Sequence, residues 1–129
     1  MSIELKDNLN GKIKSFHDLI VWQKGIELVQ KIYEVTKKFP HEEQYALSLQ
    51  MRRASVSVPS NIAEGFRRKH NREYKQFLNI ALGSCAELET QVIIAAKLNY
   101  IDDEDKNFLI ELLSYICKMI VNLNKRILI

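Results

Sequence analysis

The sequence predicts an all-α protein folded as a single antiparallel four-helix bundle. Only four glycines and two prolines interrupt the 129 residues, and so few breakers favour long helices over many short strands. Apolar residues recur at steps of three and four through successive segments, which is the helical period. The connections expected between these segments are about three to eight residues long, and short connections make consecutive helices antiparallel. The predicted topology is therefore up-down-up-down.

Length and composition exclude several classes of protein. A chain that is 47% hydrophobic and 27% charged can bury one core, which argues against disorder. The longest apolar run, Val92 to Ala96, is much shorter than the ~20 residues that span a bilayer. The N-terminal residues carry charges where a signal peptide needs an apolar stretch. We expect a cytoplasmic protein with no membrane segment, consisting of a loose arm (1–15) and one bundle domain (16–129).

The first helix is expected between Asp18, as N-cap, and about Lys38, with Pro40 stopping it. Its predicted apolar face consists of Trp22, Ile26, Val29, Ile32 and Tyr33. Trp22 is interpreted as a core residue rather than as a platform on which a base stacks.

The second helix is expected from His41–Glu43 to about Phe66, with a kink at Pro59 because proline lacks an N–H donor and crowds the preceding turn. Its core stripe comprises Leu47, Met51, Ala54, Val58 and Ile62. The serines around Pro59 have no partner motif for a nucleophile, so a shape-setting kink is favoured over a catalytic serine.

A second apolar stripe on the same helix predicts an interface between copies of the chain. Leu49, Val56 and Ala63 repeat every seven residues on a face away from the core stripe. The line of polar residues between the two stripes is Arg53, Ser57, Ser60, Glu64 and Arg67 or Arg68. A helix of a monomeric bundle needs one apolar stripe. The predicted interface comprises Leu49, Arg53, Val56, Ser60, Ala63 and Glu64.

The third helix, with Asn71 as N-cap, carries the most regular bundle pattern in the chain. Its seam consists of Tyr74, Leu78, Ala81, Cys85, Leu88, Val92 and Ala95. Gly83 and Ser84 are small enough for a close helix crossing, and Glu87 and Gln91 fall near enough to the seam to be buried.

The fourth helix is expected to open at the acidic run of residues 102–105 and to end near Lys125 and Arg126, which suit its negative end. Its apolar positions are Leu109, Leu112, Ile116, Met119, Leu123 and Ile127. The acidic run invites a metal site, but its position at a helix N-terminus explains it without one.

Residue patterns favour no enzyme, metal or cofactor. A di-iron bundle needs Glu-x-x-His pairs, and no glutamate here precedes a histidine at that spacing. The histidines lie near predicted helix ends, and the sequence has neither a P-loop nor an H-E-x-x-H motif. Cys85 and Cys117 are interpreted as buried small hydrophobes rather than as a disulfide.

Basic residues gather in one stretch of the chain. Residues 52–75 hold seven basic and two acidic side chains, a local net charge of +5. The candidate phosphate-binding side chains are Arg52, Arg53, Arg67, Arg68, Lys69, Arg72 and Lys75. The alternative is a solvated face with local partners, of which Glu64 and Arg68 at i,i+4 spacing are an example. The residues alone leave both readings open.

Ordered motifs over residues 16–125 resemble a known family. They are Phe16-His17-Asp18-Leu19, Val21-Trp22-Gln23-Lys24, Phe39-Pro40, Gln50-Met51-Arg52-Arg53-Ala54, Ser57-Val58-Pro59-Ser60-Asn61-Ile62-Ala63-Glu64-Gly65, Phe77-Leu78, Ile80-Ala81, Gly83-Ser84 and Glu87-Leu88-Glu89-Thr90-Gln91. The chain resembles the intervening-sequence proteins encoded within bacterial 23S ribosomal RNA genes. Ala46 departs from the pattern, which has glycine there.

The resemblance implies a homopentamer of four-helix bundles with a basic surface that binds RNA or DNA. That family is similar in fold to the accessory variability proteins of diversity-generating retroelements, which bind a reverse transcriptase and nucleic acid. A protein-interaction scaffold, for example an accessory subunit of a reverse transcriptase, is therefore the alternative to direct nucleic-acid binding.

Overall fold

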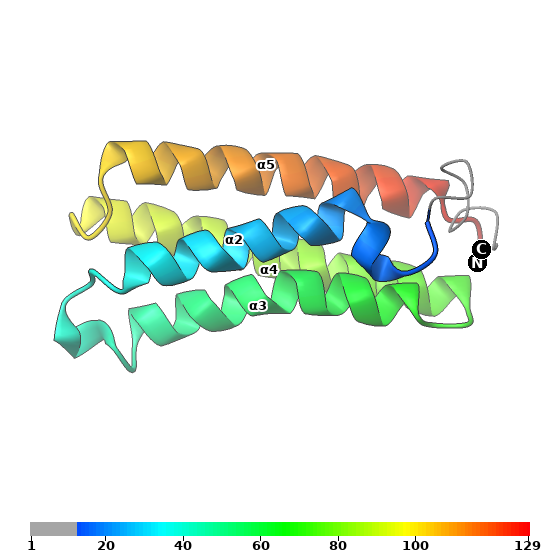
Figure 1. Ribbon diagram of the computed structural model, residues 1–129, viewed down its shortest axis with the longest axis horizontal. Helices are drawn as coiled ribbons and strands as arrows, with labels where there is room; N and C mark the ends of the chain where they lie inside the picture. Colours follow the sequence, from blue (N-terminus) through cyan, green and yellow to red (C-terminus); the bar gives the residue numbers. More distant parts are fainter. Residues whose placement is uncertain (1–12) are drawn as a thin grey trace.

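The computed structural model, which describes residues 13–129, confirms the four-helix bundle (Figure 1). The elements in chain order are η1 (Phe16–Asp18), α2 (Ile20–Thr36), η2 (His41–Glu43), α3 (Leu47–Phe66), α4 (Asn71–Lys97) and α5 (Asp103–Arg126). Successive α-helices run in opposite directions along one long axis, and both α2 and α4 pack mainly against α3 and α5. Of the arm expected over residues 1–15, residues 1–12 lie outside the described residues, and Ile13 is buried.

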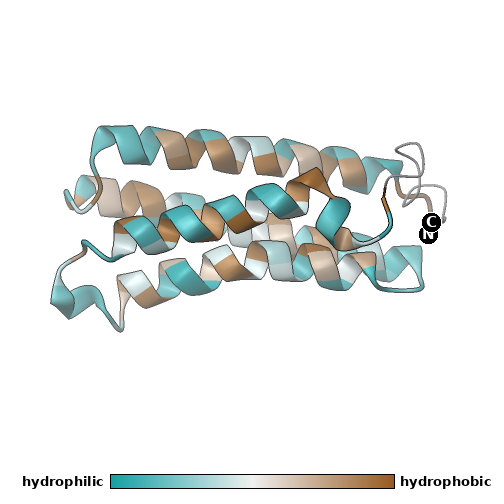
Figure 2. Cartoon of the chain, viewed as in Figure 1, coloured by the Kyte–Doolittle hydropathy of each residue, from teal (hydrophilic) through white to brown (hydrophobic). Residues whose placement is uncertain are grey.

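The core stripes predicted for α3 and α4 are confirmed. All seven seam residues of α4 are buried, as are Met51, Ala54, Val58 and Ile62 of α3, while Leu47 at the start of the α3 stripe is partly buried against the core. Hydrophobic and hydrophilic positions alternate along every helix, and the α2–α3 connection is largely hydrophilic (Figure 2). By length and composition alone α4 could cross a membrane, but its apolar seam is the centre of this bundle.

The apolar face predicted for the first helix is wrong. The residues that α2 buries are Val21, Gly25, Leu28, Ile32, Val35 and Thr36. Of the predicted face only Ile32 is fully buried, while Ile26 and Tyr33 are 36% and 39% exposed. The pattern gave no weight to Gly25, although a Cβ there would lie 3.1 Å from Cβ of Pro59. Gly25 therefore lets α2 approach α3 closely at Pro59.

Pro59 is buried inside α3, and the helix continues through it to Phe66. The Ser55 hydroxyl donates to the carbonyl of Arg52 (2.8 Å), and the Ser57 hydroxyl pairs with Ser84 of α4 (2.7 Å). These two serines therefore satisfy groups other than the carbonyl that Pro59 leaves without a donor. The kink expected there stays a prediction.

Three predicted helix starts need correction. The carboxylate of Asp18 accepts the N–H groups of Lys14 (2.8 Å) and Ser15 (3.2 Å), so it closes η1 and leaves Leu19 as the N-cap of α2. These two hydrogen bonds hold the pKa of Asp18 below its usual value. Residues 41–43 form η2, and α3 begins only at Leu47. The Glu43 carboxylate accepts the Tyr100 hydroxyl at one oxygen (2.9 Å) and the Leu47 N–H at the other (3.4 Å).

The third correction concerns α4, whose N-cap is His70 rather than Asn71. The Asn71 side chain donates to the carbonyl of Leu128 (2.6 Å) and so ties the start of α4 to the end of the chain. The acidic run does open α5, because Asp102 accepts the N–H of Asp105 at 2.8 Å and acts as N-cap.

The polar residues near the α4 seam differ in burial. Ser84 and Gln91 are buried, whereas Glu87 is exposed and accepts a hydrogen bond from Gln91 (3.3 Å). The expected burial of Glu87 is wrong because its position on the helix turns it away from the core. A Cβ on Gly83 would meet nothing within 4 Å, so the close crossing occurs at Ser84 and not at Gly83.

Candidate nucleic-acid and assembly surfaces

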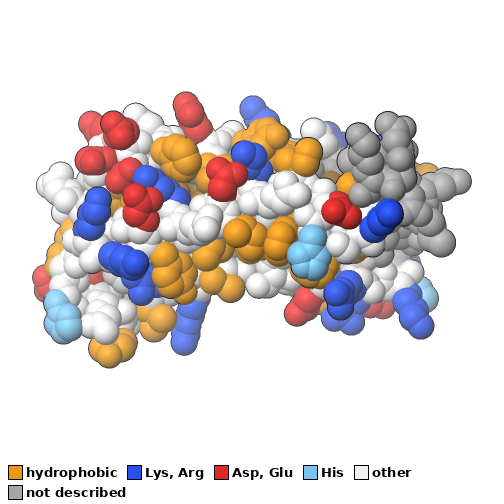
Figure 3. Space-filling model, viewed as in Figure 1, with side chains coloured by type: hydrophobic (Ala, Val, Ile, Leu, Met, Phe, Trp, Pro, Cys, Tyr) orange, Lys and Arg blue, Asp and Glu red, His pale blue; other side chains and the backbone are white. Residues whose placement is uncertain are grey.

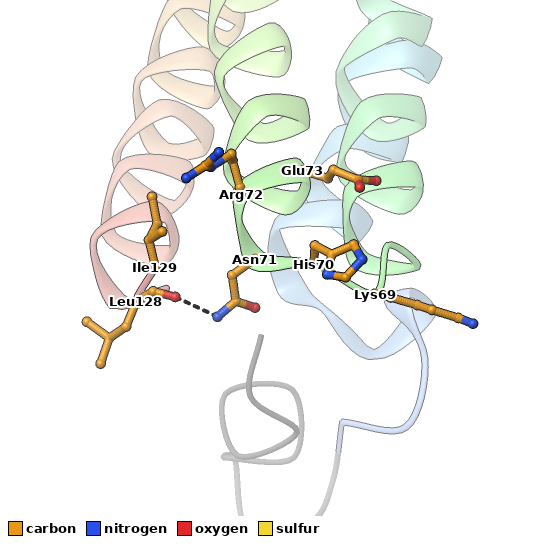
Figure 4. A pocket seen from close by; sticks show the side chains of 7 residues that line it. All are labelled: Lys69, His70, Asn71, Arg72, Glu73, Leu128 and Ile129. Atoms are coloured by element: carbon orange, nitrogen blue, oxygen red, sulfur yellow. Dashed lines mark hydrogen bonds between the residues drawn. The ribbon is translucent and has the colours of Figure 1, made fainter.

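The structure brings four of the predicted basic residues together at one end of the bundle. Arg67, Arg68, Lys69 and Arg72 are all exposed where α3 ends and α4 begins; we call these four residues the basic end. Figure 4 shows that the Lys69 and Arg72 side chains extend to opposite sides of the start of α4. The cations therefore cover a surface rather than one point.

Packing beneath the basic end fixes the backbone that carries it. A Cβ on Gly65 would lie 2.9 Å from Cβ of Phe77 and 3.0 Å from Cδ1 of Tyr74, so only glycine allows α3 to meet α4 this closely. The Arg67 guanidinium lies 5.2 Å from the ring centre of Phe16. A contact with an aromatic ring uses none of the guanidinium N–H groups as hydrogen-bond donors to oxygen, so they remain available to an anion.

Arg68 has the only acidic neighbours of the four within the described chain. Its guanidinium lies 3.9 Å from Glu64 and 4.0 Å from Glu73, and 4.7 Å from the ring centre of Phe77. Pairs this long at exposed side chains contribute little stability. The predicted pair of Glu64 and Arg68 therefore exists, and it still leaves the local charge strongly positive.

A shallow hollow of about 480 Å³ opens beside these cations (Figure 4). Its lining comprises residues 69–73 together with Leu128 and Ile129. The hollow mixes the cationic start of α4 with two exposed aliphatic side chains, so an anionic chain with apolar faces fits its chemistry.

Lys75 differs from the other predicted phosphate-binding residues, because its ammonium already has partners within the chain. Its ammonium donates to the carbonyls of Asn124 (2.6 Å) and Ile127 (3.2 Å), so it satisfies the last turn of α5. Sequence reasoning instead missed Lys125 and Arg126, which are exposed at the end of α5. They reach the same end of the bundle because α5 finishes where α4 starts. The antiparallel topology was the signal that could have found them.

Arg52 and Arg53 lie in a separate place. They are about 22 Å along α3 from Arg67, at 1.5 Å per residue. Arg52 donates through Nε to the Thr36 hydroxyl (2.9 Å), and its guanidinium lies 4.6 Å from the ring centre of Tyr33. Among residues 13–129 neither arginine forms an ion pair. The predicted seven-residue set therefore divides into the four residues of the basic end, the separate pair Arg52 and Arg53, and Lys75.

Arg52 and Arg53 border a hollow of about 420 Å³ between α2 and α3. We call its lining the α2/α3 groove; it consists of Tyr33, Leu49, Arg52, Arg53, Val56 and Ser57. Hydrophobic side chains line the middle of this face of the molecule (Figure 3). Val56 is 41% exposed at the centre of the predicted second stripe, so that stripe has apolar surface that the chain itself does not cover.

The remaining predicted interface residues flank this groove. Leu49 and Ala63 are partly exposed, and Arg53, Ser60 and Glu64 are exposed. Ser57 turns toward α4, where its hydroxyl meets Ser84 and also accepts from the Asn61 amide (2.9 Å). Ser57 is thus the point where the polar line contacts α4, while Arg53 and Ser57 also border the α2/α3 groove beside Leu49 and Val56.

The possible metal ligands and the two cysteines form no reactive site among the described residues. Over residues 13–129 no three His, Cys, Asp or Glu side chains converge as a metal site. Cys85 is buried in the core and Cys117 packs beside it, both as free thiols. A hydrogen bond with Cys117 and burial raise the pKa of the Cys85 thiol, so it is a poor nucleophile.

Comparison with known proteins supports the family inferred from the motifs. A structure from Bacteroides thetaiotaomicron, described as a protein of unknown function from the S23 ribosomal protein family, superposes with a TM-score of 0.76. It is 24% identical and is matched over 82% of this chain and 96% of its own, which shows a shared fold. A search of curated proteins gives no match. The sequence model of the 23S rRNA-intervening sequence proteins matches residues 17–122. The chain therefore belongs to the 23S rRNA-intervening sequence protein family.

Proposed function

We propose that this protein is a non-enzymatic, cytoplasmic oligomer that binds RNA or DNA through the basic end. The observation that carries this proposal is the exposure of four cations within six residues of chain, with only long ion pairs to Glu64 and Glu73 among described residues. Lys and Arg that have no buried partner neutralise phosphates with little sequence preference. Lys125 and Arg126 extend the positive surface along the same end.

The oligomer part of the proposal is supported by the α3 surface. Leu49, Val56 and Ala63 repeat at heptad spacing, and Val56 is exposed at their centre. Exposed apolar stripes of this kind are typical of helices that pack against another copy. A pentamer follows from the family resemblance. In such an oligomer several basic ends act on one nucleic acid, which raises the overall affinity without a new contact.

A protein-interaction scaffold is the second candidate, and the α2/α3 groove favours it. There the arginines sit beside apolar side chains rather than at an open end, which suits a protein partner such as a reverse transcriptase. Affinity capture from the native cell after nuclease treatment separates the two candidates. A partner that stays bound favours the scaffold, and one that is lost with the nucleic acid favours direct binding.

The proposed binding mode is tested with paired probes that differ only in backbone charge. Fluorescence anisotropy is measured with a labelled 20-nucleotide phosphodiester strand and with its neutral methylphosphonate counterpart. We expect the charged strand to bind at least tenfold more tightly, because the cations recognise phosphate and not bases. Equal affinity for the two strands, or no binding to either at low salt, would reject nucleic-acid binding by the basic end.

A further inference from the structure

A second exposed apolar stripe runs along α4 with the same heptad spacing as the one on α3. Ile80 and Ile94 are 46% and 43% exposed, and Glu87 lies midway between them on the surface. Gly83 interrupts this line of side chains, and its Cα faces open space. The α4 stripe, defined as Ile80, Gly83, Glu87 and Ile94, is therefore a ridge with a notch and one central carboxylate.

The α4 stripe is chemically complementary to the α2/α3 groove. Arg52 has its Nε hydrogen-bonded to Thr36 and its guanidinium over the ring of Tyr33, so its two terminal nitrogens are the donors left for an anion. The Glu87 carboxylate has one contact, the 3.3 Å hydrogen bond from Gln91. Apolar side chains flank the charged group in both surfaces, so each side would cover the other's exposed apolar area.

The two surfaces also match in height along the bundle. The hydrogen bond between Ser57 and Ser84 fixes the register of the antiparallel helices α3 and α4. At 1.5 Å per residue, Glu87 then lies about 3 Å from the level of Arg52. By the same count Ile94 lies about 3 Å from the level of Leu49, and Gly83 about 3 Å from that of Val56. Each of these three pairs therefore lies within about 3 Å of the same height along the bundle.

Symmetry makes this match in height significant. The two surfaces lie on different sides of the bundle, so a contact between them is heterologous and repeats from copy to copy. A ring closes only if neighbouring copies are not displaced along its symmetry axis. When the long axis of each bundle runs parallel to that symmetry axis, groups at equal height along the bundles must meet. Adjacent sides of a four-cornered bundle face roughly 90° apart, and rings of four or five copies need about 90° or 108°.

We infer that α4 of one copy packs its stripe into the α2/α3 groove of the next copy, where Arg52 binds Glu87. The inference rests on the oligomer of the proposed function and names the contact that forms it. A charge pair that is enclosed by apolar side chains loses its screening water, so breaking one partner weakens the contact strongly.

Charge reversal tests this contact by sedimentation velocity. We expect both Arg52→Glu and Glu87→Arg to raise the dissociation constant of the oligomer at least tenfold. The double variant Arg52→Glu/Glu87→Arg restores opposite charges within the contact, so it should recover most of the association. Glu89→Arg is the matched control, since this exposed glutamate lines a hollow with Lys97 and Lys106 instead and should leave association unchanged. Far-UV circular dichroism melts check that each variant is folded.

Each other outcome decides against the contact in a distinguishable way. A wild-type protein that stays monomeric at 100 μM (about a hundredfold above a micromolar dissociation constant) overturns both the proposed oligomer and this contact. A wild-type oligomer that neither single variant weakens overturns the contact alone. A double variant that is no better associated than Glu87→Arg, while folded, shows that the two side chains do not meet and also rejects it.

Discussion

Arg52 and Arg67 each belong to an arginine pair near an end of α3, yet their surroundings differ. Arg52 is half-buried, donates to the Thr36 hydroxyl and lies against Tyr33, whereas Arg67 is exposed beside Phe16 at the basic end. A guanidinium held in one orientation among apolar neighbours recognises one partner group. An exposed cation in a cluster attracts any polyanion. We therefore propose assembly for the region of Arg52 and nucleic-acid binding for the region of Arg67.

The largest expected effect separates the two regions by RNA binding. Replacing Arg67, Arg68, Lys69 and Arg72 with glutamine should weaken binding to RNA about 100-fold or more at low salt. The reason is that a protein with fewer cations displaces fewer counterions from the RNA when it binds. Arg52→Gln/Arg53→Gln should change it less than about threefold. Anisotropy with an eight-nucleotide RNA measures both, since a short strand limits the contribution of multiple copies. An equal loss of RNA affinity in the two variants would show that both regions bind RNA, which would contradict the distinction between them.

Lys75 provides a contrast within the basic end itself. Its ammonium satisfies two carbonyls at the end of α5, so Lys75→Met should lower the free energy of unfolding by about 1.5–2 kcal/mol. Lys69→Met, which removes an exposed cation with no such partners, should change it by less than about 0.5 kcal/mol. Urea denaturation measures the difference. If Lys75→Met is as stable as wild type, the ammonium of Lys75 does not stabilise the end of α5 and is available to bind phosphate.

Arg52 should stabilise the individual chain more than Arg67 does. Arg52→Met loses the hydrogen bond to Thr36 and the contact with Tyr33, so we expect a loss of about 1 kcal/mol. Arg67→Met should cost about 0.5 kcal/mol or less, because its ring contact is exposed. The comparison is made by urea denaturation at protein concentrations where wild type and variant are equally associated. The reverse order would mean that Arg52 is not held in place.

Acid sensitivity at Asp18 is the smallest effect that we expect. Backbone hydrogen bonds from Lys14 and Ser15 lower its pKa in the folded state. Its contribution is therefore complete above the unfolded value of 3.8 and is lost as the pH falls through the lower folded pKa. Thermal melts at pH 7 and pH 3 should show a smaller acid-induced drop in Asp18→Asn than in wild type. An identical drop would mean that this carboxylate does not stabilise η1.

The parts of the fold that the sequence predicted are those where side chains alone set the pattern. All seven seam residues of α4 step by four and three, and all are buried. The face of α2 could not be found this way, because Gly25 has no side chain and yet marks the closest contact with Pro59. The start of α4 was misplaced because the Asn71 side chain bonds to Leu128, far along the chain. Asp18 was misplaced for a different reason: it caps η1 through a local capping box with Ser15 instead of capping α2.

The candidate site was predictable in residue type but not in grouping. One basic stretch of sequence became two regions because α3 is long enough to separate its ends, and only the packing of α2 revealed the partners of Arg52. Lys75 differs from the other cations because its ammonium donates to the end of α5, a contact between residues far apart in the chain. Such long-range contacts carry no signal in local spacing.

The salt dependence of RNA binding tests the central claim most directly. Four cations that each neutralise one phosphate of a single strand predict that log affinity falls against log salt concentration with a slope of about −3. Arg68→Gln/Lys69→Gln should reduce that slope to about −1.5, while Arg52→Gln/Arg53→Gln should leave it unchanged. A slope near zero, or one that falls only when Arg52 and Arg53 are replaced, would contradict the assignment of nucleic-acid binding to the basic end.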